Sequence, residues 1–173
     1  MRIKLAKHIG FCAGVKRAIS ITEKTLSGSK EPVYCLGSII HNAQVMARLE
    51  SRNLVRVDSA ARVPPGSMLI LPSHGSPQKI RTQARRRSIR LIDVMCPYVA
   101  SVHAICSRIR KSGMKVVIIG DKDHPEVRAL VDLAPDAVII SDSLNIKKNV
   151  FSGLDVGIIS QTTQSREKFS EMV

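Results

Sequence analysis

Six places in the chain combine a short apolar segment with side chains that could bind a metal or an anion. They carry, in chain order, Cys12, His41, His74, Cys96, the pair His124 and Glu126, and Thr162 within Gln161-Thr162-Thr163. Thiolates bind soft metals and iron–sulfur clusters, and imidazoles donate hydrogen bonds to phosphate oxygens and titrate near neutral pH. Glu126 lies beside His124, where a carboxyl group suits proton delivery. These residue types predict a metal or cluster site beside a small anionic substrate.

Apolar segments with the length and composition of buried strands precede these residues. The segments are Ile3–Ala6, Val33–Leu36, Met68–Leu71, Leu91–Val94, Lys115–Ile119, Ala137–Ile140 and Val156–Ile159. Between them lie helical segments, at Ala13–Leu26, Ala43–Arg52, Gln78–Arg87, Pro97–Lys111 and Pro125–Leu133. This alternation predicts an α/β fold with parallel sheets. Because ligands bind outside the carboxyl ends of parallel strands, and helix N-termini there attract anions, we expect the six loops to meet at one rim.

The chain divides near Cys96 and Pro97 into two expected α/β lobes, residues 1–96 and residues 97–173. A last helix is expected after Ser165, a capping residue, because Phe169 and Met172 begin an apolar stripe at helical spacing. The sequence stops just as this helix begins. We therefore expect a C-terminal part to be missing.

Composition excludes several classes of protein. With 44% hydrophobic and 24% charged residues, the 173-residue chain is neither disordered, collagen-like nor a coiled coil. No apolar run approaches the roughly 20 residues of a membrane helix, and no secretory signal opens the chain. Four cysteines are too few for a disulfide scaffold. We expect a cytoplasmic protein with reduced thiols and no membrane association.

A strongly basic charge, with 27 Lys and Arg against 14 Asp and Glu, indicates an anionic partner. The charge is densest between Lys79 and Arg90, which a nucleic-acid-binding surface would explain. The composition argues against that interpretation, because aromatic residues make up 3% of the chain and few rings are available to stack on bases. A solvated helix face explains the run more simply, and we expect no nucleic-acid partner.

The motifs around the reactive residues also occur together, and in this order, in one known family. They are Gly10-Phe11-Cys12-Ala13-Gly14-Val15-Lys16-Arg17-Ala18-Ile19, Leu36-Gly37-Ser38-Ile39-Ile40-His41-Asn42, Ser73-His74-Gly75, Asp93-Val94-Met95-Cys96-Pro97 with Val102-His103, His124-Pro125-Glu126-Val127, and Ser160-Gln161-Thr162-Thr163. Ser-His-Gly alone is a weak signal, whereas the ordered set is specific. On these motifs the chain resembles the N-terminal part of the 4-hydroxy-3-methylbut-2-enyl diphosphate reductases (the LytB/IspH family).

The resemblance implies a three-lobed α/β protein around a cavity with a 4Fe-4S cluster, of which the third lobe is missing here. It implies an oxidoreductase of the non-mevalonate isoprenoid pathway, which removes the substrate's allylic hydroxyl as water to give isopentenyl and dimethylallyl diphosphate. Its partners would be the allylic diphosphate, an electron donor of the ferredoxin or flavodoxin type, and the missing C-terminal part.

The resemblance also assigns roles to matching positions. It implies that Cys12 and Cys96 are two of three cluster ligands, with the third cysteine beyond residue 173. His41, His74 and His124 would bind the diphosphate, Glu126 would supply protons, and Thr162 would lie near the substrate hydroxyl.

The other two cysteines are not expected to be ligands. Cys35 lies in an expected strand and Cys106 in an expected helix, so both are interpreted as buried thiols.

The chain departs from the family pattern before the second cluster cysteine. The family usually has Ala-Thr or Thr-Thr there, whereas this chain has Val94-Met95. Three interpretations of the chain's function are therefore kept: a fragment or divergent copy of the reductase, a non-enzymatic nucleic-acid binder, and an inactive remnant.

Overall fold

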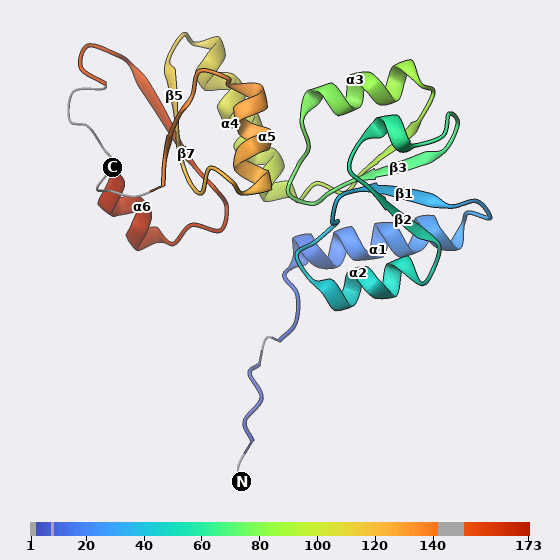
Figure 1. Cartoon of the computed structure of the whole chain (residues 1–173). Helices are drawn as coiled ribbons and strands as arrows, with labels where there is room; N and C mark the ends of the chain where they lie inside the picture. The colour runs from blue at the N-terminus through green and yellow to red at the C-terminus, as the bar shows by residue number, and fades with distance from the viewer. Residues whose placement is uncertain (1–2, 8, 142–150) are drawn as a thin grey trace.

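Two parallel β-sheets, each covered by helices, make up the computed structural model, which describes residues 3–7, 9–141 and 151–173 (Figure 1). The first sheet has the strand order β2-β1-β3-β4 and the second the order β6-β5-β7. Every strand pair is parallel. The prediction of two parallel-sheet α/β lobes is therefore confirmed.

The first lobe contains β1 (Val33–Leu36), β2 (Leu54–Val57), β3 (Met68–Leu71), β4 (Arg90–Asp93), α1 (Ala13–Ser27), α2 (Ala43–Glu50), the 3-10 turn Ala60–Arg62, and α3 (Gln78–Arg86). Successive side chains of a strand face opposite sides of its sheet. Val33 and Cys35 accordingly pack with α1 and α2, whereas Tyr34 and Leu36 pack in the cluster that contains residues of α3. Figure 1 shows α1 and α2 on one face of this sheet and α3 on the other.

The second lobe contains α4 (Pro97–Lys111), β5 (Lys115–Ile119), α5 (Pro125–Leu133), β6 (Val138–Ile140), β7 (Val156–Ser160) and α6 (Arg166–Met172). Val116 and Ile118 face α4 and α5, and Val117 and Ile119 form the opposite cluster, which contains Met172 of α6. The side-chain oxygen of Ser165 accepts a hydrogen bond from the Lys168 amide, so the expected cap of α6 is present.

The two lobes follow one plan, which no repeat in the sequence reveals. Each begins with a cysteine before a 15-residue helix, Cys12 before α1 and Cys96 before α4. A strand, a helix and a second strand follow, and the sheet orders β2-β1-β3 and β6-β5-β7 correspond. Equivalent loops of the two lobes therefore carry the reactive residues.

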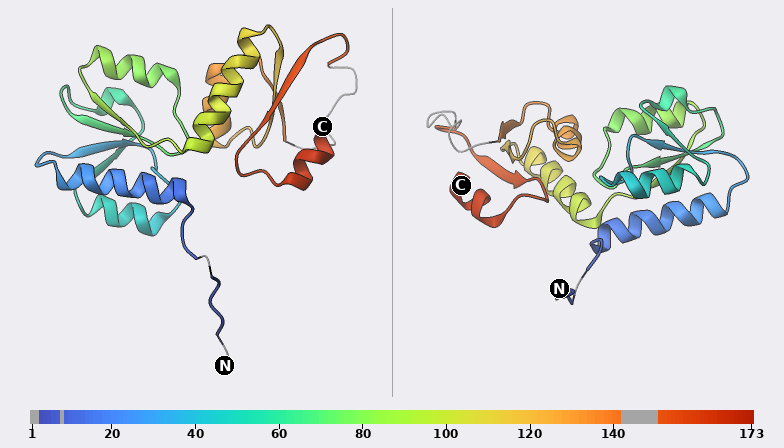
Figure 2. Two further views of the ribbon diagram at one scale, coloured as in Figure 1. Left: turned by 180° about the vertical axis from the view of Figure 1, so that it is seen from behind. Right: turned by 60° about the horizontal axis from the view of Figure 1, so that its bottom comes forward.

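The lobes lie side by side and touch through loops and helices (Figure 2). The Gln78 amide at the start of α3 donates a 2.7 Å hydrogen bond to the Asp132 carboxylate of α5. The contact holds the start of α3 against α5. Within the first lobe, the Cys96 amide donates to the Ser73 carbonyl at 2.9 Å and so continues the pairing of β4 with β3 up to the start of α4.

One expected strand is absent, and one strand that the sequence did not predict is present. Ile3–Ala6 is not a strand: it is exposed and extends away from the first lobe, because a strand needs a neighbour to pair with and none of the described segments lies beside it (Figure 2). Leu54–Val57 was not expected but forms β2. It is an edge strand in which Val55 and Arg56 are exposed, so its composition is less apolar than that of the inner strands.

None of the helices in the described part of the chain is both long enough and apolar enough to cross a membrane.

Candidate functional site

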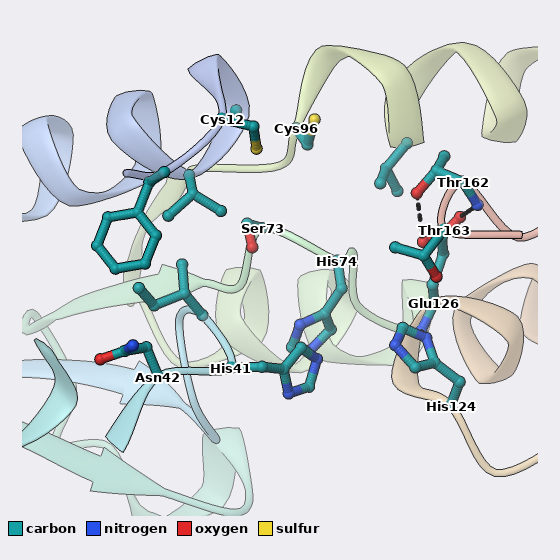
Figure 3. A pocket seen from close by; sticks show the side chains of 15 residues that line it. Cys12, His41, Asn42, Ser73, His74, Cys96, His124, Glu126, Thr162 and Thr163 are labelled. Carbon is teal, nitrogen blue, oxygen red and sulfur yellow. Dashed lines mark hydrogen bonds between the residues drawn. The ribbon is translucent and has the colours of Figure 1, made fainter. Parts of the chain in front are cut away.

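A cavity of about 250 Å³ lies where the two lobes meet. It is lined by every residue singled out from the sequence: Cys12, His41, His74, Cys96, His124, Glu126 and Thr162 (Figure 3). The residues come from loops and helix starts of both lobes. The expected convergence of the six loops is thus observed, although the roles of the individual residues stay predictions.

The two cysteines occupy equivalent places at the N-termini of α1 and α4, and neither side chain caps its helix. Both thiols lie near the position that a side chain on Gly14 would occupy. A Cβ atom at Gly14 would lie 2.5 Å from Cys96 Sγ and 4.0 Å from Cys12 Sγ. Glycine is therefore the residue that leaves room for the Cys96 thiol. Helix N-termini favour negative charge, which suits thiolate ligands here.

Three histidines gather at the centre of the cavity (Figure 3). The rings of His41 and His74 stack with centroids 5.0 Å apart, and the His124 ring lies 5.5 Å from that of His41. His124 Nδ1 accepts a hydrogen bond of 3.2 Å from the Glu126 amide. The proton of a neutral His124 is consequently on Nε2, which can donate to an anion.

Burial and neighbouring imidazoles together lower the pKa of His74. Desolvation is the largest cause, and the charges that His41 and His124 can carry add to it, so that the pKa falls to about 4. An anion among the three rings would reverse the repulsion between them, since opposite charge favours the protonated form.

Glu126, at the start of α5, is a buried carboxylate that is 2% exposed. Thr162, in the loop after β7, binds both of its oxygens. Glu126 Oε1 accepts from the Thr162 amide and its Oε2 accepts from the Thr162 hydroxyl, both at 2.8 Å. Figure 3 draws both bonds at the wall of the cavity. The arrangement joins a carboxyl group to a hydroxyl group that reaches the cavity.

Backbone and amide hydrogen bonds tie these loops together. Ser73 N and Oγ both donate to the Ile39 carbonyl, two residues before His41, at 3.1 and 2.9 Å. Gln161 Nε2 donates to Thr163 Oγ1 at 2.6 Å, and its Oε1 accepts from the Asp121 amide at 3.1 Å. The loop after β7 is thereby joined to the loop that carries His124.

Sequence analysis did not single out the apolar wall of the cavity, which consists of Phe11, Val15, Ile40 and Val99. Val15 and Val99 each lie three residues after a cysteine. Residues three apart share one face of a helix, so this spacing could have found them.

Cys35 and Cys106 are buried in the two cores, as expected. Burial raises the pKa of Cys35 to about 12, which the Arg56 charge partly offsets, and burial likewise raises the pKa of Cys106. Both thiols therefore stay protonated and away from the cavity.

The basic run is partly engaged in the fold. Arg81 pairs with Asp93, and Arg87 donates a hydrogen bond to the Val63 carbonyl at 3.1 Å. Arg85 and Arg86 are exposed in the last turn of α3. This supports the interpretation of the run as a solvated helix face.

The donor set fits part of an iron–sulfur site. Two thiols share one space, which matches two ligands of a cluster. Within the described residues, however, no three His, Cys, Asp or Glu side chains are placed to bind one metal ion.

The parallel sheets and the cysteine–histidine cavity define the class: an α/β protein whose two repeated lobes present thiols and imidazoles to one site. Its family follows from comparison with known proteins, because the model of the family described as "LytB protein" matches residues 3–173. The chain belongs to this family.

Several curated 4-hydroxy-3-methylbut-2-enyl diphosphate reductases are similar to the chain. That of Aromatoleum aromaticum is 35% identical over 175 residues, which cover 99% of this chain and 55% of the relative. That of Aquifex aeolicus is 36% identical over 174 residues, which cover 99% of this chain and 60% of the relative. The chain thus spans a little over half the length of these relatives.

Two solved structures share the fold. One is a reductase described as the terminal enzyme of the non-mevalonate pathway, with a TM-score of 0.85 and 35% identity over 99% of this chain and 62% of that one. The other is the corresponding reductase of Plasmodium falciparum, with a TM-score of 0.87 and 30% identity over 94% of this chain and 52% of that one.

Proposed function

We propose that the chain carries two lobes of a 4-hydroxy-3-methylbut-2-enyl diphosphate reductase, residues 1–96 and 97–173. The proposed reaction replaces the allylic hydroxyl of the substrate with hydrogen. Two electrons and two protons are consumed: one proton leaves with the hydroxyl as water and the other ends on carbon, giving isopentenyl or dimethylallyl diphosphate. The observation that carries the proposal is the shared cavity of two thiols, three imidazoles and the Glu126–Thr162 pair.

The diphosphate is assigned to His41, His74 and His124. Neighbouring imidazoles repel one another when protonated, and the His41 ring lies beside those of both His74 and His124, so a multiply charged anion is the ligand that stabilises the three together. Four helices also begin at the cavity, after Cys12, Asn42, Cys96 and His124. Helix N-termini are positive, and phosphate groups bind there.

Proton delivery is assigned to Glu126 acting through Thr162. The Thr162 hydroxyl donates to Glu126, which leaves its oxygen lone pairs available to the substrate hydroxyl. A proton placed on Glu126 can then pass through Thr162 to the departing oxygen. Burial of Glu126 keeps water from competing for the same bonds.

The electrons are assigned to a 4Fe-4S cluster held by Cys12, Cys96 and a third cysteine outside this chain. When bound, such a cluster supplies electrons singly from an external donor of the ferredoxin or flavodoxin type. The two thiols near Gly14 support this assignment, and the apolar side chains of Val15 and Val99 lie on the same wall.

The proposed activity is tested by adding the C-terminal part of a relative to the chain. The chain and the C-terminal part of the Aromatoleum aromaticum relative are purified separately, mixed without oxygen, reconstituted with iron and sulfide, and assayed with a reduced viologen and the allylic alcohol diphosphate. We expect isopentenyl and dimethylallyl diphosphate from the mixture, and a loss of at least about 100-fold with Glu126→Gln. The exposed Glu171→Gln variant is the control. A cluster-loaded mixture that makes neither product would refute the proposal.

A further inference from the structure

His103 is a half-buried histidine between the two lobes, and the proposed chemistry does not use it. It lies on α4, in the second lobe, with its side chain against Gly75 of the first lobe. A Cβ atom on Gly75 would be 3.1 Å from His103 Nε2 and 3.2 Å from its Cε1. Gly75 also has φ +91°, a conformation that side chains disfavour.

This contact fixes the backbone next to His74. Gly75 directly follows His74, and Ala129 of α5 lies 3.5 Å from the same Cβ position. The loop after β3 is therefore held between the second lobe on one side and Ile39, through Ser73, on the other. A flat imidazole and a glycine fit this space, whereas a branched side chain at position 103 would displace the loop.

Unpartnered polar atoms gather at the same loop. Among the described residues, four buried side-chain atoms lack a hydrogen-bond partner, and three of them are His74 Nδ1, Ser76 Oγ and His103 Nε2. A buried polar atom without a partner destabilises the folded state, so an apolar residue at position 103 would be favoured by stability alone. A histidine here is better explained by the site than by the core.

We infer that His103 is a positioning residue, whose imidazole packs on Gly75 and thereby holds His74 in place to bind the diphosphate. The inference rests on the proposed function. His103 is not among the residues that line the cavity and acts through the loop after β3. It thus couples the second lobe to an anion-binding residue of the first.

The surroundings of His103 favour its neutral form. Burial is the main cause that lowers its pKa; the Arg81 charge on α3 lowers it further, and Asp93 on β4 acts in the opposite direction. Arg81 and Asp93 pair with each other. A neutral ring can pack closely on the Gly75 backbone without a counter-charge.

The test compares His103→Ala with two other variants of α4 in the full 173-residue chain. His103→Gln keeps a flat polar group of similar length. Ile109→Ala removes a buried core side chain that contacts Gly157 instead, and controls for loss of stability. Binding of inorganic diphosphate is measured by calorimetry, and the pKa of His74 by NMR of its ring protons.

We expect His103→Ala to weaken diphosphate binding by about tenfold, the size of one lost hydrogen bond to a charged group. We also expect the His74 pKa to rise toward its ordinary value of 6.5 as the loop loosens and His74 becomes hydrated. His103→Gln should largely restore both quantities, and Ile109→Ala should change neither.

The two measurements separate this inference from the proposed function. Diphosphate affinity and a His74 pKa that are unchanged in His103→Ala would overturn the inference, as would equal effects of Ile109→Ala. If the unaltered chain binds no diphosphate, the proposed function fails, and the His74 pKa alone decides whether His103 positions the loop.

Discussion

Glu126 and Thr162 form a pair in the cavity that two hydrogen bonds hold together. Both carboxylate oxygens accept from a single residue, once from its backbone and once from its hydroxyl. The types of these residues could be predicted from sequence, because a Glu beside a His suits proton delivery. Their pairing could not, because 36 residues separate them in the chain and only the placement of β7 beside β5 brings them together.

Replacing Glu126 with Gln tests this pair. The Thr162 hydroxyl can turn to accept from the NH₂ group of a glutamine, but two hydrogen bonds to a carboxylate are then replaced by two neutral ones. We expect Glu126→Gln to lower the free energy of unfolding by about 1–3 kcal/mol, because hydrogen bonds to a charged group are the stronger kind. Urea unfolding at neutral pH measures it. Glu171→Gln, an exposed change, should have little effect, and equal stability of the two variants would contradict the assignment.

His74 makes stability depend on pH. Its pKa in the folded chain is about 4, below the ordinary 6.5, so the unfolded chain binds more protons between these values. Stability is therefore complete above pH 6.5 and decreases as the pH falls toward 4. At about 1.4 kcal/mol per pH unit, the loss approaches about 3 kcal/mol.

The His74→Asn variant, which does not titrate, should lose less stability between pH 7.5 and pH 5 than the unaltered chain. The remaining slope would include His103, whose pKa is lowered in the same direction. Urea unfolding at the two pH values provides the measurement. Parallel losses in both proteins would show that the folded state does not depress the His74 pKa.

At the scale of elements, the sequence alone was sufficient to predict where a helix begins when a proline marks its first turn. Pro97 and Pro125 begin α4 and α5, at the bounds that the sequence predicted, because proline suits the first helical turn. Ile3–Ala6 and Leu54–Val57 show that composition alone does not predict every strand. Whether an apolar or mixed segment becomes a strand depends on a neighbouring strand, which composition does not reveal.

Gly157 shows how closely α4 packs on the second sheet. A Cβ atom there would lie 2.6 Å from Ile109 Cγ1. We expect Gly157→Ala to lower the free energy of unfolding by about 1–3 kcal/mol through overpacking. In the background of Ile109→Ala, which removes both Cγ atoms, Gly157→Ala should cost less than in the unaltered chain, as a double-mutant cycle by urea unfolding would show. Strictly additive effects would indicate that the two residues do not press on each other.

At the scale of the whole molecule, the sequence predicted one rim because parallel strands end on one side of their sheet. It did not predict that two repeated lobes place equivalent loops face to face. The plan is visible only in topology, since Cys12 and Cys96 precede helices of equal length whose sequences differ. The hydrogen bond from the Gln78 amide to the Asp132 carboxylate then joins α3 of the first lobe to α5 of the second.

The same arrangement limits how well the 173-residue chain can bind an iron–sulfur cluster. It brings two thiols together, and Cys35 and Cys106 are buried elsewhere. Since a cluster with one open iron needs three thiolates, we expect less than one 4Fe-4S cluster per chain after anaerobic reconstitution, by iron and sulfide counting and Mössbauer spectroscopy. Adding the C-terminal part of a relative should raise the yield. A stoichiometric cluster in the chain alone, unaffected by Cys96→Ser, would contradict the ligand assignment.

The central claim is that one anionic ligand binds between the lobes, on histidines from both. Calorimetric titration with the allylic alcohol diphosphate tests it most directly, using His41→Ala from the first lobe and His124→Ala from the second. We expect each variant to weaken binding by about tenfold or more, the effect of one charge-assisted hydrogen bond. The control, Arg85→Ala combined with Arg86→Ala, should bind as the unaltered chain does. Binding that depends on the two arginines and not on the histidines, or a tighter affinity for a random DNA duplex, would contradict the account.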